Sequence, residues 1–305
     1  MLDPHELYEI AGELPELDRP VLIQAMSGFV DAGASTRLAG EHLLQSGTAQ
    51  LVATFDIDQL LHYRSRRPLM DFREDHWESY EQPRIELHLL HDDEDTRYLL
   101  LTGPEPDLQW ERFIAAVTLL IERLGVRLTV GLNAIPMAVP HTRPGGVIAH
   151  ATRPELIAGH ESWLQSVRVP ASAGNLLEFR LGQTGHDALG FAVHVPHYLA
   201  ESDYPGGAEL LLASVSRATG LLIPTQRLRD AAEVMVAEVD AQVAQTEEAL
   251  ALVHGLEQQY DAYLRGKATT NLLDNAGPLP TADQLGAELE RFLAERTHPG
   301  DISGA

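Results

Sequence analysis

The stretch S-G-F-V-D-A-G, residues 27–33, decides the fold and directly follows the apolar run V-L-I-Q-A-M of residues 21–26. A short apolar run that is entered from Pro20 and left through glycines is typical of a buried parallel strand whose exit turn opens a helix. Ligands of open α/β sheets bind at the carboxyl ends of the strands. The turn at residues 27–33 is therefore the first place where the sequence predicts a site.

Length and composition indicate a folded globular protein. The chain has 305 residues, of which 44% are hydrophobic, enough for one large α/β domain with an appendage. Its formal net charge of −23 repels nucleic-acid phosphates and anionic membrane surfaces. The chain has no cysteine, which excludes disulfides and thiolate metal sites. We therefore expect neither nucleic acid nor a membrane as a partner.

The N-terminus and the lysine content indicate where the protein is located and whether it binds a cofactor. The first residues lack the basic region and apolar core of a signal peptide, and no later apolar run reaches the roughly 18 residues of a membrane span. We expect a cytoplasmic protein. Lys267 is the only lysine, and the phosphate-binding motif G-x-x-x-x-G-K-[ST] is absent. The sequence therefore predicts no cofactor.

Strands and helices alternate from residue 21 to about residue 219. The sequence predicts strands at 21–26, 51–57, 85–91, 97–102, 127–134, 147–151 and 189–195, and helices at 34–45, 107–124, 176–181 and 204–219. Asp107 is expected to cap its helix and Pro136 to end its strand, while residues 60–84 form a polar excursion outside the core. This order predicts a three-layer α/β/α sandwich over residues 1–225.

Residues 226–305 have a different character. Residues 228–264 contain no proline and show apolar side chains at a spacing of three to four, which predicts one helix of about 55 Å. Gln242 and Thr246 interrupt the apolar seam, so packing against a neighbouring element or subunit is favoured over an autonomous coiled coil. A second helix is expected at 281–296. The region 226–305 is thus predicted to be a helical C-terminal appendage.

Polar side chains and glycines at the predicted strand exits are the candidate ligand-binding residues. They are Gly28, Asp31, Gly33, Glu105, Asn133, His141, Thr142, Arg143 and His197. The carboxyl ends of parallel strands meet at one edge of a sheet, where carboxylates could do acid–base work and an arginine could hold an anion. Catalytic residues are not assigned.

Each of these candidates has a structural alternative. A tight turn or a close helix approach would explain Gly28 and Gly33, and helix capping would explain Asp31. Arg143, in a loop bounded by prolines, suits an ion pair better than a catalytic contact. His194 and His197 are three residues apart but lack a third ligand, so no metal site is predicted.

Three motifs in order carry a resemblance to a known family. G-F-V-D-A-G at 28–33, T-G-P-E-P-D at 102–107 with Trp110 behind it, and V-P-H-T-R-P at 139–144 resemble the proteasome assembly chaperone 2 family in its actinobacterial branch. The resemblance covers residues 5–225, and the helical tail is similar to that of bacterial members. It implies a fold related to purine nucleoside phosphorylases and, from the eukaryotic relatives, a role in protein assembly.

Two functions follow as hypotheses. The first is a non-catalytic, assembly-chaperone-like protein that forms a homo-oligomer, expected to be a trimer by kinship of fold, and contacts proteasome subunits. The alternative is a small-molecule-binding protein, or a hydrolase or transferase acting on nucleoside-like or anionic compounds. The alternative requires Asp31, Glu105, His141 and Arg143 to converge at the strand-end cleft.

Overall fold

The computed structural model of the chain describes residues 2–160 and 166–270. The chain divides into two compact units, residues 1–257 and residues 258–305. The sheet, the helices that cover it and all candidate residues belong to the first unit. No helix in the described part of the chain is both long and apolar enough to cross a membrane.

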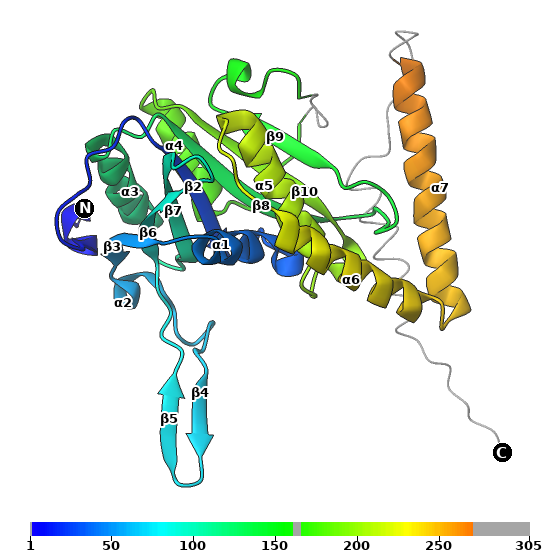
Figure 1. The fold of residues 1–305 in the computed structure, drawn as a ribbon, viewed down its shortest axis with the longest axis horizontal. Helices are drawn as coiled ribbons and strands as arrows, with labels where there is room; N and C mark the ends of the chain where they lie inside the picture. Colours follow the sequence, from blue (N-terminus) through cyan, green and yellow to red (C-terminus); the bar gives the residue numbers. More distant parts are fainter. Residues whose placement is uncertain (1, 161–165, 271–305) are drawn as a thin grey trace. The chain divides into compact units, whose positions relative to one another are not determined.

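An eight-stranded mixed sheet forms the centre of the first unit (Figure 1). Its spatial order is β1 (Tyr8–Ile10), β3 (Gln50–Phe55), β6 (Glu86–His91), β7 (Arg97–Pro104), β2 (Val21–Ser27), β8 (Leu128–Met137), β10 (Ala188–Pro196) and β9 (Val147–Ala151). The four strands β7, β2, β8 and β10 run parallel, and the outer pairs are antiparallel. The predicted strands are thus present, and the 85–91 and 97–102 runs form the expected hairpin.

The strand β2 shows why the sheet is buried on both faces. Val21, Ile23 and Ala25 enter one apolar cluster, whereas Leu22 and Met26 enter the other. Successive side chains of a strand point to opposite faces, so an unbroken apolar run requires a covering layer on each side. The parallel centre of the sheet, with β2 in its middle, meets this requirement.

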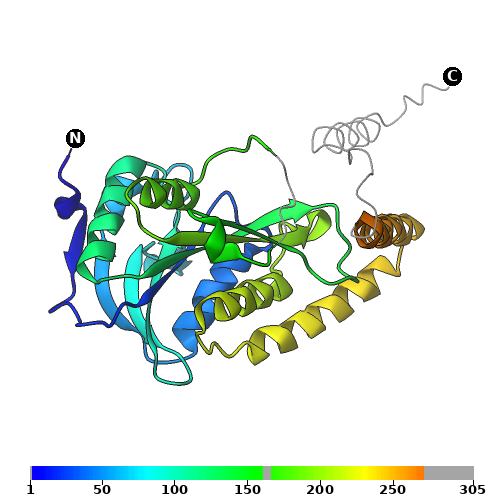
Figure 2. The ribbon, with the colours of Figure 1, turned by 90° about the horizontal axis from the view of Figure 1, so that it is seen from above.

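Helices provide the two covering layers, which Figure 2 shows on either side of the sheet. One layer contains α1 (Ser35–Gln45) and α5 (Pro205–Thr219), with α6 (Gln226–Val243) packed against α5. The other contains α3 (Trp110–Arg123) and α4 (Ala173–Gln183). The α/β/α sandwich predicted from the sequence is confirmed.

Short helical turns complete the order of elements. They are η1 (Pro4–Leu7), η2 (Ala32–Ala34), α2 (Ile57–Leu60), η3 (Pro154–Ile157) and η4 (His197–Leu199). The predicted 281–296 helix lies outside the described residues.

Two predicted element boundaries were wrong. Asp107 does not cap α3; its carboxylate accepts a hydrogen bond from the His62 amide at 2.8 Å, and Gln109 occupies the cap position with φ 55°. Pro136 does not end β8, which continues to Met137. Ala134 lies two residues earlier, so its amide points to the same side of β8 as the nitrogen of Pro136. The Ala134 amide donates to the Val30 carbonyl, and the segment after Val30 turns away from β8. A missing N–H at Pro136 therefore costs no ladder bond.

The predicted single helix over 228–264 is two helices. α6 ends at Val243, and α7 (Glu247–Thr270) begins after a break at residues 244–246. The Thr246 hydroxyl accepts a hydrogen bond from the Ala249 amide at 3.3 Å, as an N-cap does. The interruption of the apolar seam at Thr246 thus marks a new helix start.

The polar excursion at 60–84 contains a separate two-stranded sheet. β4 (Met70–Arg73) pairs antiparallel with β5 (His76–Tyr80), and every residue of both strands is exposed. Figure 1 shows this hairpin in cyan, extending away from the eight-stranded sheet. The hairpin was not predicted, although its exclusion from the core was.

Candidate functional site

Glu105 links three segments at the carboxyl end of β2 and β7. Its side chain is buried, and its amide donates to the Ser27 carbonyl at 2.7 Å. Its carboxylate accepts hydrogen bonds from the Phe29 amide at 3.2 Å and from the Ala173 amide, in the first turn of α4, at 2.7 Å. A negative charge at the N-terminus of a helix is favourable because the helix dipole is positive there. Glu105 therefore holds the β2 exit turn against the start of α4.

The two glycines of the turn are required by close packing. A Cβ atom on Gly28 would lie 2.4 Å from Oε2 of Glu105, and one on Gly33 would lie 2.6 Å from Cβ of Tyr204. Gly33 also has a φ of +63°, in the left-handed region. Between them, Phe29 points outward with 70% of its surface exposed. The turn geometry accounts for both glycines without a ligand.

Asp31 contacts the first turn of α1. Its carboxylate accepts a hydrogen bond from the Thr36 amide at 2.6 Å, and burial raises its pKa. The carboxylate thus satisfies a first-turn amide of α1, as the capping alternative expects, although Ala34 occupies the N-cap position. A ligand contact for Asp31 stays a prediction.

Asn133 lies in β8, and His197 directly follows the neighbouring parallel strand β10. Asn133 is buried in β8, in register with Ala192 of β10. His197 begins η4, and its ring meets the Tyr198 ring edge-on at 5.4 Å. Its Nδ1 atom is buried and has no hydrogen-bond partner within the described residues. A ligand contact for either residue stays a prediction.

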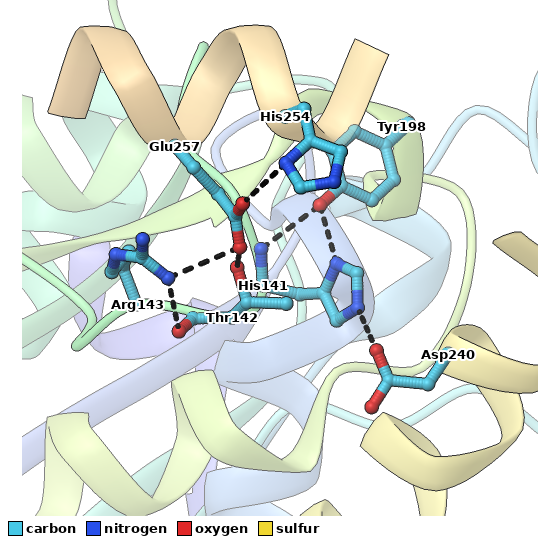
Figure 3. A network of polar contacts seen from close by, with 7 residues as sticks. All are labelled: His141, Thr142, Arg143, Tyr198, Asp240, His254 and Glu257. Carbon is cyan, nitrogen blue, oxygen red and sulfur yellow. Dashed lines mark hydrogen bonds and ion pairs between the residues drawn. The ribbon is translucent and has the colours of Figure 1, made fainter. Parts of the chain in front are cut away.

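The loop at 141–143 is held by a polar network that we call the clasp (Figure 3). It consists of His141, Thr142, Arg143, Tyr198, Asp240, His254 and Glu257.

His141, whose side chain is fully buried, is the centre of one half of the clasp. Its Nδ1 lies 2.6 Å from the Tyr198 hydroxyl, and its Nε2 lies 3.0 Å from the Asp240 carboxylate on α6. An ionised carboxylate only accepts, so Nε2 donates to Asp240, and Nδ1 shares the other hydrogen bond with the Tyr198 hydroxyl. Every polar atom of the ring is thereby satisfied.

Glu257, on α7, is the centre of the other half. Its carboxylate accepts from the Thr142 hydroxyl at 2.6 Å and from Arg143 Nη1 at 3.1 Å, and it lies 3.2 Å from His254 Nδ1. The hydrogen bond from Thr142, followed by the positive charge of Arg143, lowers the pKa of Glu257. The ion pair predicted as the structural alternative for Arg143 is present.

The Tyr198–His141–Asp240 chain has the connectivity of a proton relay. Burial raises the pKa of Tyr198 to about 12, so the phenol stays protonated at neutral pH. The hydrogen bonds of this chain connect the strand exits to α6.

Nearby histidines do not form a metal site. His194 is buried in β10, and burial lowers its pKa to about 4, which keeps the imidazole neutral near pH 7. Within residues 2–160 and 166–270, no group of three or more histidine, aspartate or glutamate side chains is arranged to hold a metal ion.

The four residues whose convergence the enzyme hypothesis required each have separate partners. Asp31 bonds the Thr36 amide, and Glu105 bonds two backbone amides. His141 and Arg143 are adjacent in the clasp, but their carboxylate partners are on α6 and α7. The structure brings the loop residues together with Asp240 and Glu257, which the sequence-based candidates did not include.

No curated protein matches this chain. The model of the PAC2 family matches residues 25–243. A Mycobacterium tuberculosis protein of unknown function, Rv2714, has 47% identity and a TM-score of 0.85, with 87% of this chain and 92% of that chain covered. A Corynebacterium glutamicum protein of unknown function has 36% identity and a TM-score of 0.81, covering 85% and 98%.

A more distant structure shares the fold. The Mycobacterium tuberculosis proteasome-assembly chaperone homologue Rv2125 has 24% identity and a TM-score of 0.70, with 76% of this chain and 99% of that chain covered. The family match, over most of the chain, agrees with the three motifs at residues 28–33, 102–107 and 139–144. The chain belongs to the PAC2 family.

Proposed function

We propose that the protein acts through protein–protein contact, as an assembly-chaperone-like homo-oligomer, and that the β4–β5 hairpin is its contact surface. Large apolar side chains exposed on the hairpin carry this proposal. They are Leu69, Met70, Phe72, Trp77 and Tyr80. Exposed apolar patches of this kind mark interaction sites, and aromatic residues are enriched in interfaces.

The geometry of the hairpin supports the same function. Phe72 is 58% exposed and Trp77 is 62% exposed. Their ring centroids lie 5.1 Å apart in an edge-on arrangement across the two strands, so the two rings form a single aromatic surface. A two-stranded hairpin alone is at best marginally stable in water. Contact with another molecule would stabilise the hairpin and remove its aromatic surface from water.

The nature of the partner is part of the proposal. We assign a second copy of the chain to the hairpin, with a trimer as the expected order. The proteasome-assembly chaperone homologue of the same fold supports proteasome subunits as further partners. The clasp and the Glu105 contacts support a non-catalytic role, because they occupy the side chains on which the ligand-binding alternative depends.

Sedimentation velocity of the purified chain at several concentrations tests the hairpin. Phe72→Ser should shift the protein toward the monomer, because it removes half of the aromatic pair. Phe179→Ser on α4 is the matched control, since Phe179 is also 58% exposed. A chain that is monomeric at all concentrations and binds no proteasome α subunit would contradict the proposal.

A second measurement separates the ligand-binding alternative. Thermal-shift screening with nucleosides, nucleotides and phosphate compares the wild type with Arg143→Ala. A compound that stabilises only the wild type would favour the alternative, whereas no stabilisation agrees with the contact function.

A further inference from the structure

The edge strand β9 directs a row of backbone groups away from the sheet. It is the last strand of the sheet and pairs antiparallel with β10. Two hydrogen bonds at its ends set the phase of the pairing: His194 donates to the Gly146 carbonyl, and Thr152 donates to the Ala188 carbonyl, both at 2.9 Å. In an antiparallel pair, the backbone N–H and C=O groups of every second residue point toward the neighbouring strand. The N–H and C=O groups of the intervening residues of β9 therefore point away from the sheet.

These outward residues are Val147, Ala149 and Ala151. Within the described residues, their N–H and C=O groups make no hydrogen bond. All three residues are half-buried, so water reaches these groups incompletely. Backbone groups in such surroundings are normally paired, and an unpaired row of donors and acceptors is a template for another strand.

The opposite edge of the sheet has a protection that β9 lacks. β1 carries the exposed Glu9, and further acidic residues flank it at Asp3, Glu6 and Glu13. Charges on an edge strand discourage pairing with another chain. The β9 sequence V-I-A-H-A has no carboxylate, lysine, arginine or proline, and its register with β10 has no bulge.

The surroundings of β9 are equally free of acidic residues in the sequence. No aspartate or glutamate occurs between Glu122 and Glu155, although the chain has 45 acidic residues. On one face, Val147, Ala149 and Ala151 pack against the apolar core together with the side chains of η3. On the other face, His150 Nδ1 lies 2.9 Å from the Glu178 carboxylate of α4. An incoming strand would thus meet an apolar surface on the core side of β9.

We propose that β9 binds an extended, uncharged apolar segment of a partner protein by strand addition. The length of β9 favours a linear segment over a second copy of the chain. Five residues span roughly 17 Å, too little for the roughly 1,000 Å² that a stable interface between folded proteins buries. The proposal concerns a different surface from the hairpin and does not depend on it.

The test uses the full chain and a labelled peptide with the sequence of β10, residues Ala188–Pro196. This sequence is chosen because β9 already pairs with β10 within the sheet. Ala149→Pro removes an outward N–H that the β9–β10 ladder does not use, so the sheet is kept. Ala149→Val is the matched control, because it keeps the N–H and favours a strand.

Fluorescence anisotropy should show peptide binding to the wild type and to Ala149→Val, with Kd at least about tenfold higher for Ala149→Pro. Circular dichroism checks the fold, and Ala149→Lys replaces the proline variant if that variant unfolds. No binding to the wild type at about 1 mM peptide, or equal binding by the proline or lysine variant, would overturn the proposal. A fall in oligomer mass caused by Ala149→Pro would instead make a second copy the occupant and also overturn it.

Discussion

Replacing Glu105 by glutamine should destabilise the protein, because a carboxylate with two backbone donors becomes an amide with one acceptor. Oε2 accepts from Phe29 at 3.2 Å and Oε1 from Ala173 at 2.7 Å. In the glutamine variant, one of these amides faces an NH₂ group, so two donors oppose each other and one buried N–H loses its partner.

The magnitude follows from two losses. A buried donor left without its partner costs about 1–3 kcal/mol. The negative charge at the N-terminus of α4 contributes typically about 0.3–1 kcal/mol. We therefore expect Glu105→Gln to lower the free energy of unfolding by about 1–4 kcal/mol.

Urea unfolding followed by circular dichroism, at one fixed protein concentration, measures this loss. Glu238→Gln on α6 is the control: Glu238 is exposed, and the substitution should change the free energy of unfolding by less than about 0.5 kcal/mol. An equally small effect for Glu105→Gln would refute the reasoning, since it would mean that the two backbone amides find other partners.

Two further predictions concern the β2 exit turn and the clasp. Gly33→Ala should cost at least about 1 kcal/mol more than Gly47→Ala in urea unfolding, because only Gly33 has a positive φ and a crowded Cβ position. The pKa of Glu257 lies below its ordinary value of 4.5 in the folded protein, so its ionised form stabilises the fold above pH 4.5. This contribution is lost as the pH falls through the folded pKa. The stability difference between the wild type and Glu257→Gln should therefore be constant near pH 7 and shrink below about pH 4.5; a difference that grows in acid would contradict this assignment.

The sequence predicts the core of the fold well because local signals agree with burial. The run 21–26 is apolar at nearly every position, and β2 is buried on both faces. The prediction fails where tertiary contacts override a local signal. Proline normally ends a strand, but Pro136 stays in register with Val195 of β10, and its missing N–H would point to the side of β2, where the β2–β8 ladder has already ended. Asp107 is a good capping residue, but the His62 amide competes for its carboxylate.

The sequence predicts only part of the candidate site. His141, Thr142 and Arg143 can be identified as candidates because prolines and glycines restrict their loop. Asp240 and Glu257 do not, because they are two of many acidic residues on long polar helices. Their role depends on the break between α6 and α7, which lets two helices approach the same loop from different directions. No spacing in the sequence pairs these carboxylates with a loop about 100 residues earlier.

The hydrogen-bonding state of the polar groups bears on the two functional hypotheses. An enzyme keeps reactive polar groups available at the strand exits, where substrate replaces water as their partner. Here the strand-exit carboxylates and the clasp histidine are bonded within the chain. Among the described residues, the buried Nδ1 of His197 at the β10 exit has no hydrogen-bond partner. The aromatic side chains of the hairpin and the outward backbone of β9 are also left open. The hairpin and β9 are what another polypeptide recognises, through apolar contact and strand pairing. These two surfaces therefore support the proposal that the protein acts by binding other chains.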